Sequence, residues 1–356
     1  MFIVDAHQDI AYNALNFGRD YRHSVGETRA REQNSTHPNG IATLGLPDAL
    51  LGRVALTFAT VFTEPATAPS ILNTTSPRYK TPQEAYRQAL NQIDHYHRLA
   101  DAEDTIRLVR TQSELDAVLA SWEPDKPAKD RRMGFVLLME NGDPILEPRQ
   151  FEEWYERGIR IVGPAWAATR YCGGTGQPGG LTTEGRKLLD VLADFNVILD
   201  VSHMAEQAFF DSIEQYTGTV IASHSNPRRF RNSDRHLSDE MILRLAERDG
   251  VMGIVMFNRF LSDTWQKSDR RSDLPLTVVL DAMDYICQLT GSARHVGIGT
   301  DFDGGFGMES IPDGLESVAS LWEIGEGLRK RGYSETDIEG ILSGNFLRKL
   351  RETLPA

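Results

Sequence analysis

Cysteine is scarce in this chain of 356 residues, which contains only Cys172 and Cys287. Two thiols cannot form the disulfide framework of a small secreted protein, so a reducing compartment is the simple inference. No apolar run approaches the roughly 20 residues that a membrane helix needs. Residues 1–4 resemble a strand and lack the basic segment and cleavage site of a signal peptide. We therefore expect a cytoplasmic protein with no membrane partner.

Positive charge is also in short supply, because 38 basic residues face 51 acidic ones and the net charge is -13. No cluster of basic residues indicates a nucleic-acid-binding surface, so we exclude nucleic acid as a partner and expect a small-molecule substrate. Hydrophobic residues make up 40% of the chain and charged residues 25%, as in ordinary globular proteins. We find no internal repeat and expect one domain over residues 1–356.

Apolar segments of strand length recur along the chain, and helix-length amphipathic segments separate them. The predicted strands are residues 2–6, 54–63, 133–140, 159–163, 196–201, 218–223, 251–257 and 295–300. Most are continuously apolar, which is typical of parallel strands covered on both faces. The predicted helices are residues 81–100, 183 to about 196, 238–248, 275–289, 314–331 and 335–353.

Eight strand-helix alternations predict an α/β fold of the (β/α)8 TIM-barrel type. The alternative is an open doubly wound sheet. Polar residues follow the first, third, fifth, sixth and eighth strands, and in an open sheet those ends would lie too far apart to converge. This favours the closed barrel. Two irregular stretches, about 18–45 and 171–182, are expected to be rim loops.

Five of the predicted strands end in side chains that commonly bind metals. Barrel enzymes build their active sites from the C-terminal ends of the strands. Three imidazoles and three carboxylates are enough to hold two divalent ions and leave one carboxylate for proton transfer. The candidate residues are His7, Asp9, Glu140, His203, His224 and Asp301.

The spacing of these residues supports a shared site, although each alone has an ordinary explanation. His7 and Asp9 are two residues apart, so on a strand both side chains face the same way. Glu140 ends an apolar run, where burial without a partner is costly and a cation is one remedy. Alternatives are a helix cap, a solvated rim glutamate, hydrogen-bonded core histidines and a turn aspartate. Strand parity directs Asp200 elsewhere, as a support for the ligands.

Residues 174–179 fit the glycine pattern of a dinucleotide site. We reject that interpretation because the segment is not joined tightly to a strand and Pro178 removes a backbone donor. A loop is the expected structure.

Several short motifs, in order and spacing, resemble those of the membrane (renal) dipeptidase family, which are zinc peptidases on an amidohydrolase-like barrel. The resemblance runs from residue 5 to beyond residue 300. The matching segments are Asp5-Ala6-His7-Gln8-Asp9, Met139-Glu140-Asn141-Gly142, Asp200-Val201-Ser202-His203, Ser223-His224-Ser225-Asn226, Asp234-Arg235-His236-Leu237-Ser238-Asp239, His295-Val296-Gly297-Ile298-Gly299-Thr300-Asp301-Phe302-Asp303-Gly304 and Gly344-Asn345-Phe346-Leu347-Arg348.

The resemblance implies two zinc ions per chain. His7 and Asp9 would bind one ion, His203 and His224 would bind the second, and Glu140 would bind both. Ligands of this kind also suit manganese, iron or cobalt. Barrels of this type often pair, so a homodimer is one expected arrangement.

The implied activity is hydrolysis of the amide bond in dipeptides or related N-acyl amino acids. In that reading Asp301 is the catalytic acid and base. Arg235 receives the substrate carboxylate, a task suited to a planar bidentate donor. We also place Asn258 among the expected substrate contacts.

One position departs from the family pattern. A substrate-contacting histidine that helps polarise the carbonyl is replaced by Trp166, which cannot accept a proton. Arg170 or Tyr171 could take its place, and all three are candidate substrate contacts. Two alternatives follow. One is a metal-dependent amidohydrolase or lactonase acting on a non-peptide substrate, and the other is a non-catalytic binding protein on the same scaffold.

Overall fold

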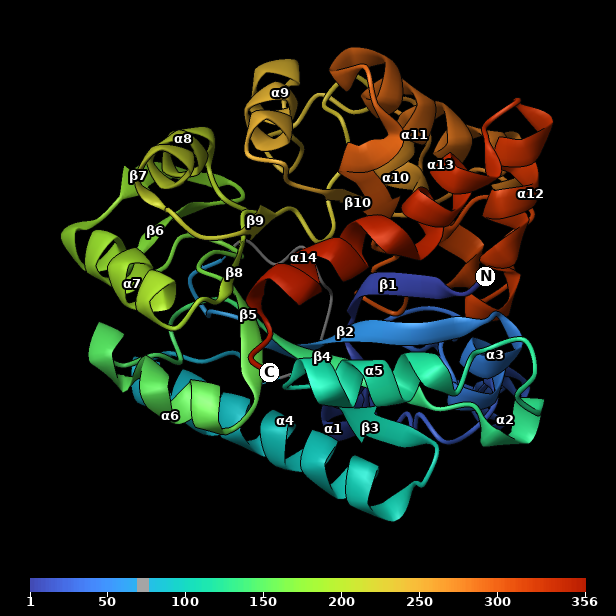
Figure 1. The fold of residues 1–356 in the computed structure, drawn as a ribbon, viewed down its shortest axis with the longest axis horizontal. Helices are drawn as coiled ribbons and strands as arrows, with labels where there is room; N and C mark the ends of the chain where they lie inside the picture. Colours follow the sequence, from blue (N-terminus) through green and yellow to red (C-terminus); the bar gives the residue numbers. More distant parts are fainter. Residues whose placement is uncertain (69–76) are drawn as a thin grey trace.

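The computed structural model describes residues 1–68 and 77–356 and contains a barrel of parallel strands surrounded by helices (Figure 1). The strand order is β10-β11-β1-β2-β4-β5-β8-β9. A parallel bridge from Ala222, just after β9, to Met252 of β10 closes the ring. The strands are β1 (Ile3–Gln8), β2 (Val54–Phe62), β4 (Met133–Glu140), β5 (Ile159–Gly163), β8 (Ile198–Asp200), β9 (Val220–Ile221), β10 (Met252–Ile254) and β11 (Val296–Ile298). The predicted barrel is confirmed, and the open sheet is excluded.

The helices lie mostly around the outside of the barrel (Figure 1). Side-chain caps explain several starts, since Thr81, Thr182 and Ser238 each accept a backbone hydrogen bond from the first turn. The helices are α1 (Ile10–Phe17), α2 (Val25–Glu32), α3 (Leu46–Leu51), α4 (Pro82–Ala102), α5 (Gln112–Ala120), α6 (Phe151–Glu156), α7 (Thr183–Asp194), α8 (Glu206–Gln215), α9 (Asp239–Glu247), α10 (Asn258–Leu261), α11 (Thr277–Thr290), α12 (Trp322–Lys330), α13 (Glu335–Glu339) and α14 (Asn345–Thr353).

The C-terminal helices differ from the predicted pair. The helix expected over residues 314–331 begins only at Trp322. Gly314 has a φ of 99°, and Ser317 caps a short 3-10 turn, so the chain is not α-helical before that point. The helix expected over residues 335–353 contains a π-helical segment at residues 340–344 between α13 and α14.

The stretches expected to be rim loops contain regular structure. Helix α2 lies within residues 18–45, and a capping box between Ser24 and Glu27 starts it. Residues 171–182 form an antiparallel hairpin of β6 (Cys172–Gly174) and β7 (Gln177–Leu181). The remaining strand, β3 (Ile106–Leu108), pairs with β4 and was not predicted, because only its first residue is fully buried and it makes no apolar run.

The barrel interior is apolar at the end where the strands begin. Alternate residues such as Leu56, Val136 and Leu138 fill it and are fully buried. Helix α14 crosses the barrel (Figure 1), and its Phe346 ring packs edge-on against Phe58 with centroids 5.4 Å apart. Apolar packing therefore occupies this end of the barrel, and the polar side chains gather at the opposite end.

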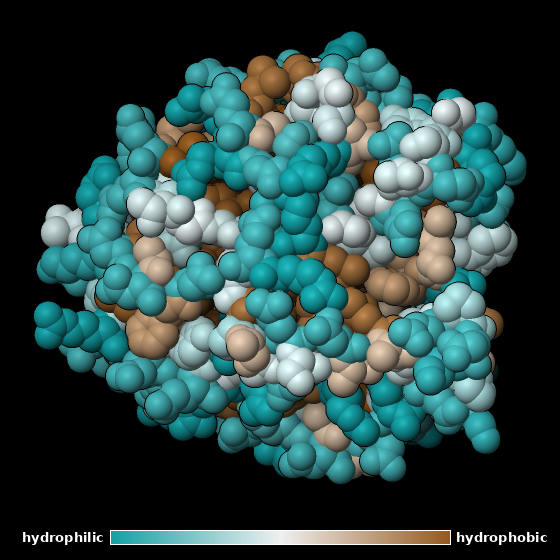
Figure 2. Space-filling model, viewed as in Figure 1, coloured by the Kyte–Doolittle hydropathy of each residue, from teal (hydrophilic) through white to brown (hydrophobic). Residues whose placement is uncertain are grey.

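The molecular face in Figure 2 is mainly hydrophilic, with apolar side chains in small patches. No helix within residues 1–68 and 77–356 combines the length and apolar character needed to cross a bilayer. The exposed large apolar side chains of the described residues are Met1, Leu15, Ile41, Leu51, Leu243 and Trp322.

Candidate metal centre

Glu140, the last residue of β4, lies at the centre of a buried polar cluster. Its Oε1 atom is 3.2 Å from Nε2 of His203 and 3.2 Å from Nε2 of His224. Its Oε2 atom is 3.4 Å from Nε2 of His7. One carboxylate oxygen thus faces His203 and His224 while the other faces His7, whose ring stacks on that of His224 with centroids 3.5 Å apart.

Two further carboxylates approach His7 from either side. Its Nε2 atom is 3.9 Å from Asp9 Oδ1 and 3.9 Å from Asp301 Oδ1. Ligand atoms of these three residues lie within 4.8 Å of one another, and so do those of His7, Glu140 and His224. The structure therefore brings together all six residues that the sequence proposed for the metal centre.

Local backbone geometry places several of these side chains. The pairing of β1 with β2 shifts register between Asp5 and Gln8, the part of the strand that contains His7. His203 and Asp301 have φ values of 65° and 57°, in the left-handed region that costs a non-glycine residue energy. Such backbone strain clusters at functional sites because it aims a side chain where a regular strand would not.

The charges in the cluster favour cation binding. Burial lowers the pKa of His203 to about 4, and burial also lowers the pKa of His224. Both rings are therefore neutral near pH 7, and a neutral imidazole has one ring nitrogen whose lone pair can bind a metal. Burial works against a charged His7, but the carboxylates, led by Glu140, outweigh it and raise its pKa to about 10. Burial raises the pKa of Asp301. Bound cations would supply the positive charge that these carboxylates attract.

Hydrogen bonds behind the cluster hold His224. Its Nδ1 atom lies 2.8 Å from Ser223 Oγ, and that hydroxyl donates to the carboxylate of Asp200. Asp200 also accepts the backbone N–H of Ser223 at 2.9 Å. The side chain of Asp200 therefore acts behind the ligands, in the place that strand parity predicted. Sequence analysis did not identify Ser223, because serine next to a candidate ligand is no distinctive signal.

Other supporting residues were also missed. Asp5 accepts hydrogen bonds from the backbone and side chain of Thr300 at 2.8 and 2.7 Å, and it thereby joins β1 to the end of β11. Asp303 pairs with Arg19 at 3.0 Å, which ties the segment before α2 to the same strand end. Asp5 and Asp303 lie in the motifs that resemble the dipeptidase family, but their hydrogen-bond and ion-pair partners are distant in sequence, so the motifs did not reveal these contacts.

The predicted substrate contacts Arg235 and Trp166 lie beside the cluster. Arg235 donates to the His224 carbonyl at 2.8 Å and to Ser225 Oγ at 3.3 Å, while its buried Nε has no hydrogen-bond partner among the described residues. The Trp166 ring lies next to His203, with centroids 6.0 Å apart and planes tilted by 37°. Asn258 is fully buried at the start of α10, and its Nδ2 donates to the Ile311 carbonyl at 3.3 Å.

Arg170 and Tyr171 bond to the loop after β4 rather than to the cluster. Arg170 donates to the carbonyl oxygens of Asp143 and Leu146 at 3.0 and 2.8 Å. The buried hydroxyl of Tyr171 donates to the carbonyl oxygen of Ile145. These bonds hold both side chains against the loop after β4, and a substrate contact by either residue stays a prediction.

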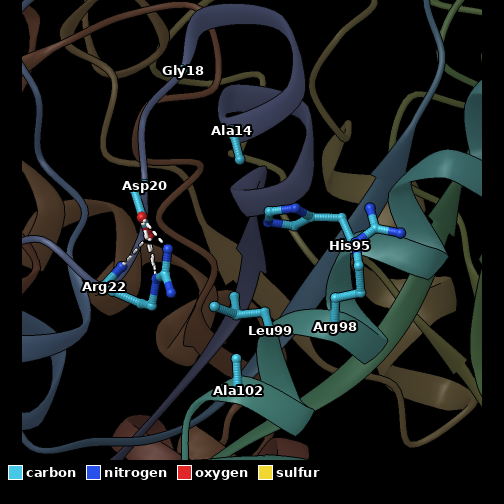
Figure 3. A pocket seen from close by; sticks show the side chains of 8 residues that line it. All are labelled: Ala14, Gly18, Asp20, Arg22, His95, Arg98, Leu99 and Ala102. Atoms are coloured by element: carbon cyan, nitrogen blue, oxygen red, sulfur yellow. Dashed lines mark hydrogen bonds and ion pairs between the residues drawn. The ribbon is translucent and has the colours of Figure 1, made fainter.

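A cavity of about 350 Å³ lies elsewhere, between α1 and α4 on the outside of the barrel (Figure 3). Arg98 and His95 line one side of it, and Asp20 on the other side is paired with Arg22 at 2.6 Å. None of the six cluster residues lines this cavity, so it is separate from the candidate metal centre.

Comparison with protein families decides the classification. The profile of the family described as Membrane dipeptidase (Peptidase family M19) matches residues 1–355. The chain belongs to the membrane dipeptidase family. The resemblance read from the sequence motifs is confirmed, and the chain is a metal-dependent hydrolase of the dipeptidase type.

The chain is also similar to individual proteins in sequence or in fold. An uncharacterized protein in the pqqA 5' region of Klebsiella pneumoniae is 34% identical over 254 residues, which cover 68% of this chain and 91% of that protein. A metallo peptidase from Rhodobacter sphaeroides, solved with a phosphinate mimic of the dipeptide L-Ala-D-Ala, has a TM-score of 0.78 at 23% identity over 99% of both chains. The probable dipeptidase PvdM from Pseudomonas aeruginosa has a TM-score of 0.78 at 20% identity, covering 99% of this chain and 96% of that one. The two structures share the fold.

Proposed function

We propose that this protein is a binuclear zinc-dependent hydrolase that cleaves the amide bond of dipeptides or related N-acyl amino acids. The position of Glu140 carries the proposal, because its two carboxylate oxygens face different imidazoles at 3.2 and 3.4 Å. His7 and Asp9 would hold one ion, His203 and His224 the other, and Glu140 both. Zinc is commonly bound by imidazoles and carboxylates, and a cation in this site would take the place of the proton that the carboxylates hold on His7.

When bound, the two ions would polarise the substrate carbonyl and lower the pKa of a water molecule toward neutrality. The protein's own groups then move the proton. Asp301 accepts a proton from the water molecule while the water oxygen attacks the carbonyl carbon of the substrate. It returns that proton to the amine nitrogen as the C–N bond breaks. Burial raises the pKa of Asp301, which suits a group that must hold a proton between these two steps.

Arg235 is the proposed receptor for the substrate carboxylate. Two of its nitrogens are bonded to His224 and Ser225, so the guanidinium is fixed in place, and its Nε lacks a partner among the described residues. A fixed guanidinium loses little freedom when it binds a carboxylate. Trp166, beside His203, is proposed to form an apolar wall of the same substrate site.

The test has a binding arm and a turnover arm. Zinc per chain is counted on purified wild-type protein and on His203→Ala, and hydrolysis is followed with L-Ala-D-Ala, L-Ala-L-Ala, N-acetyl-alanine and a simple lactone. The Rhodobacter sphaeroides ligand motivates the first substrate. We expect two ions in the wild type, fewer in the variant, and amide hydrolysis that is lost with the zinc. Full activity in His203→Ala would contradict the proposed metal centre. Turnover of the lactone alone would show that the substrate is a lactone and not an amide.

A further inference from the structure

The turn of the β6–β7 hairpin, residues 174–177, is hydrogen-bonded to three parts of the candidate site. Thr175 Oγ1 lies 3.0 Å from Nδ1 of His203, and Thr175 N donates to the Trp166 carbonyl at 3.1 Å. Gly176 N donates to the Asp234 carboxylate at 2.8 Å. Asp234 precedes Arg235 in the chain, so this turn connects the second ligand group, the aromatic wall and the arginine loop.

The three imidazoles of the cluster are held in different ways. His224 is held from within the barrel by Ser223 and Asp200. The Nδ1 atom of His7 has no hydrogen-bond partner among the described residues. His203 alone is held by a residue of the hairpin, through Thr175. Its orientation therefore depends on a segment outside the barrel strands.

The contact with Thr175 favours the His203 tautomer that carries its proton on Nδ1. The Thr175 hydroxyl lies 3.4 Å from the His203 carbonyl and donates to it, which leaves the hydroxyl oxygen to accept the Nδ1–H of the ring. In that tautomer the lone pair is on Nε2, which lies 3.2 Å from Glu140 Oε1 and 3.0 Å from His224 Nε2, the other proposed ligands of the second cation. A hydrogen bond of this kind sets the tautomer and orientation of a metal-binding histidine.

The glycines of the hairpin explain how its backbone packs so closely against neighbouring backbone. A Cβ atom at Gly174 would lie 2.3 Å from the Ala167 carbonyl oxygen, and one at Gly173 would lie 2.5 Å from the backbone of Gly179. Gly174 also bridges to Met204, next to His203. The glycine motif thus allows close backbone packing at the mouth of the barrel.

We propose that Thr175 is the positioning residue for His203, and that it sets the affinity of the second cation and not of the first. The inference rests on the proposed function, because it needs two cation sites in one chain. Among the described residues, His7 and Asp9 make no hydrogen bond with the hairpin turn, and they reach His203 only indirectly, through Glu140 and the stacked ring of His224.

The experiment compares Thr175→Ala, Thr175→Val and Thr175→Ser with the wild type. Thr217→Ala, an exposed threonine, is the matched control. Metal-free protein is titrated with zinc against a competing chelator to obtain both dissociation constants, and Tm is measured to compare folding. We expect the second ion to bind about ten- to a hundredfold more weakly in the alanine and valine variants. Thr175→Ser, which keeps the hydroxyl, and the control should match the wild type.

Three results would overturn the inference. The first is a second dissociation constant within twofold of wild type in Thr175→Ala. The second is an equal loss at both sites, which would indicate general loosening. The third is an equal loss in Thr175→Ser. A wild-type chain that binds fewer than two ions would instead overturn the proposed function. The wild-type protein is therefore titrated with zinc before any variant is compared.

Discussion

Replacing Glu140 by glutamine tests the central feature of the metal centre. The substitution keeps the size of the side chain and removes its negative charge, so the barrel should fold as before. Glu140 is buried, and its oxygens lie 3.2 to 3.4 Å from three imidazole nitrogens. Because the role proposed for Glu140 is to bind both ions, its loss should weaken the binding of both ions at once.

The magnitude follows from the burial of this carboxylate. Removing one partner from a buried charged pair costs about 3–5 kcal/mol. That energy corresponds to a loss of about 10²- to 10⁴-fold in an equilibrium or rate constant. We therefore expect Glu140→Gln to bind fewer than two zinc ions at stoichiometric metal, and its kcat/KM for a dipeptide should fall by a factor in this range.

The assay measures zinc per chain by elemental analysis, kcat/KM with a chromogenic or coupled dipeptide assay, and Tm of the metal-free protein. Glu214→Gln is the matched control, since Glu214 is exposed on α8. The reasoning would be refuted if Glu140→Gln kept two ions and a kcat/KM within tenfold of the wild type. A large fall in the Tm of the metal-free variant would show a folding defect, and Glu140→Asp would then separate charge from size.

Three further predictions concern other residues. Ser223→Ala removes the link between Asp200 and His224, so zinc affinity should fall about ten- to a hundredfold in a chelator competition, with an unchanged circular dichroism spectrum. Trp166→His restores the family histidine beside His203, and kcat for L-Ala-D-Ala should rise; an unchanged kcat would show that this position does not limit the reaction. Burial acts to raise the pKa of Asp249, but hydrogen bonds led by Arg294 outweigh it and lower the pKa to about 2 from 3.8. This stabilisation, about 1 kcal/mol after solvent screening, is present above pH 4 and lost as the pH falls toward 2. Urea unfolding of Asp249→Asn at pH 7 and pH 2.5 should therefore show a destabilisation that shrinks at the lower pH.

The barrel was predictable because its strands carry their own signal. Buried parallel strands are apolar on both faces, so segments such as 133–140 and 159–163 match β4 and β5 residue for residue. Short elements were not predictable in this way. The β6–β7 hairpin is glycine-rich, and its second strand is mostly exposed or half-buried, so hydrogen bonds rather than apolar pattern define it. The cytoplasmic location and the homodimer stay predictions.

The sequence by itself determined the ligand chemistry, because histidines and carboxylates that follow apolar strands must emerge at the same end of a parallel barrel. Only the tertiary structure decided which atoms meet. One oxygen of Glu140 faces His7 and the other faces His203 and His224, and Thr175 and Ser223 reach His203 and His224 respectively. Such contacts depend on a register shift, on left-handed backbone at His203 and on a hairpin 28 residues away in sequence. Hydrogen-bond geometry of this kind is set by packing in three dimensions and leaves no periodic pattern in the chain.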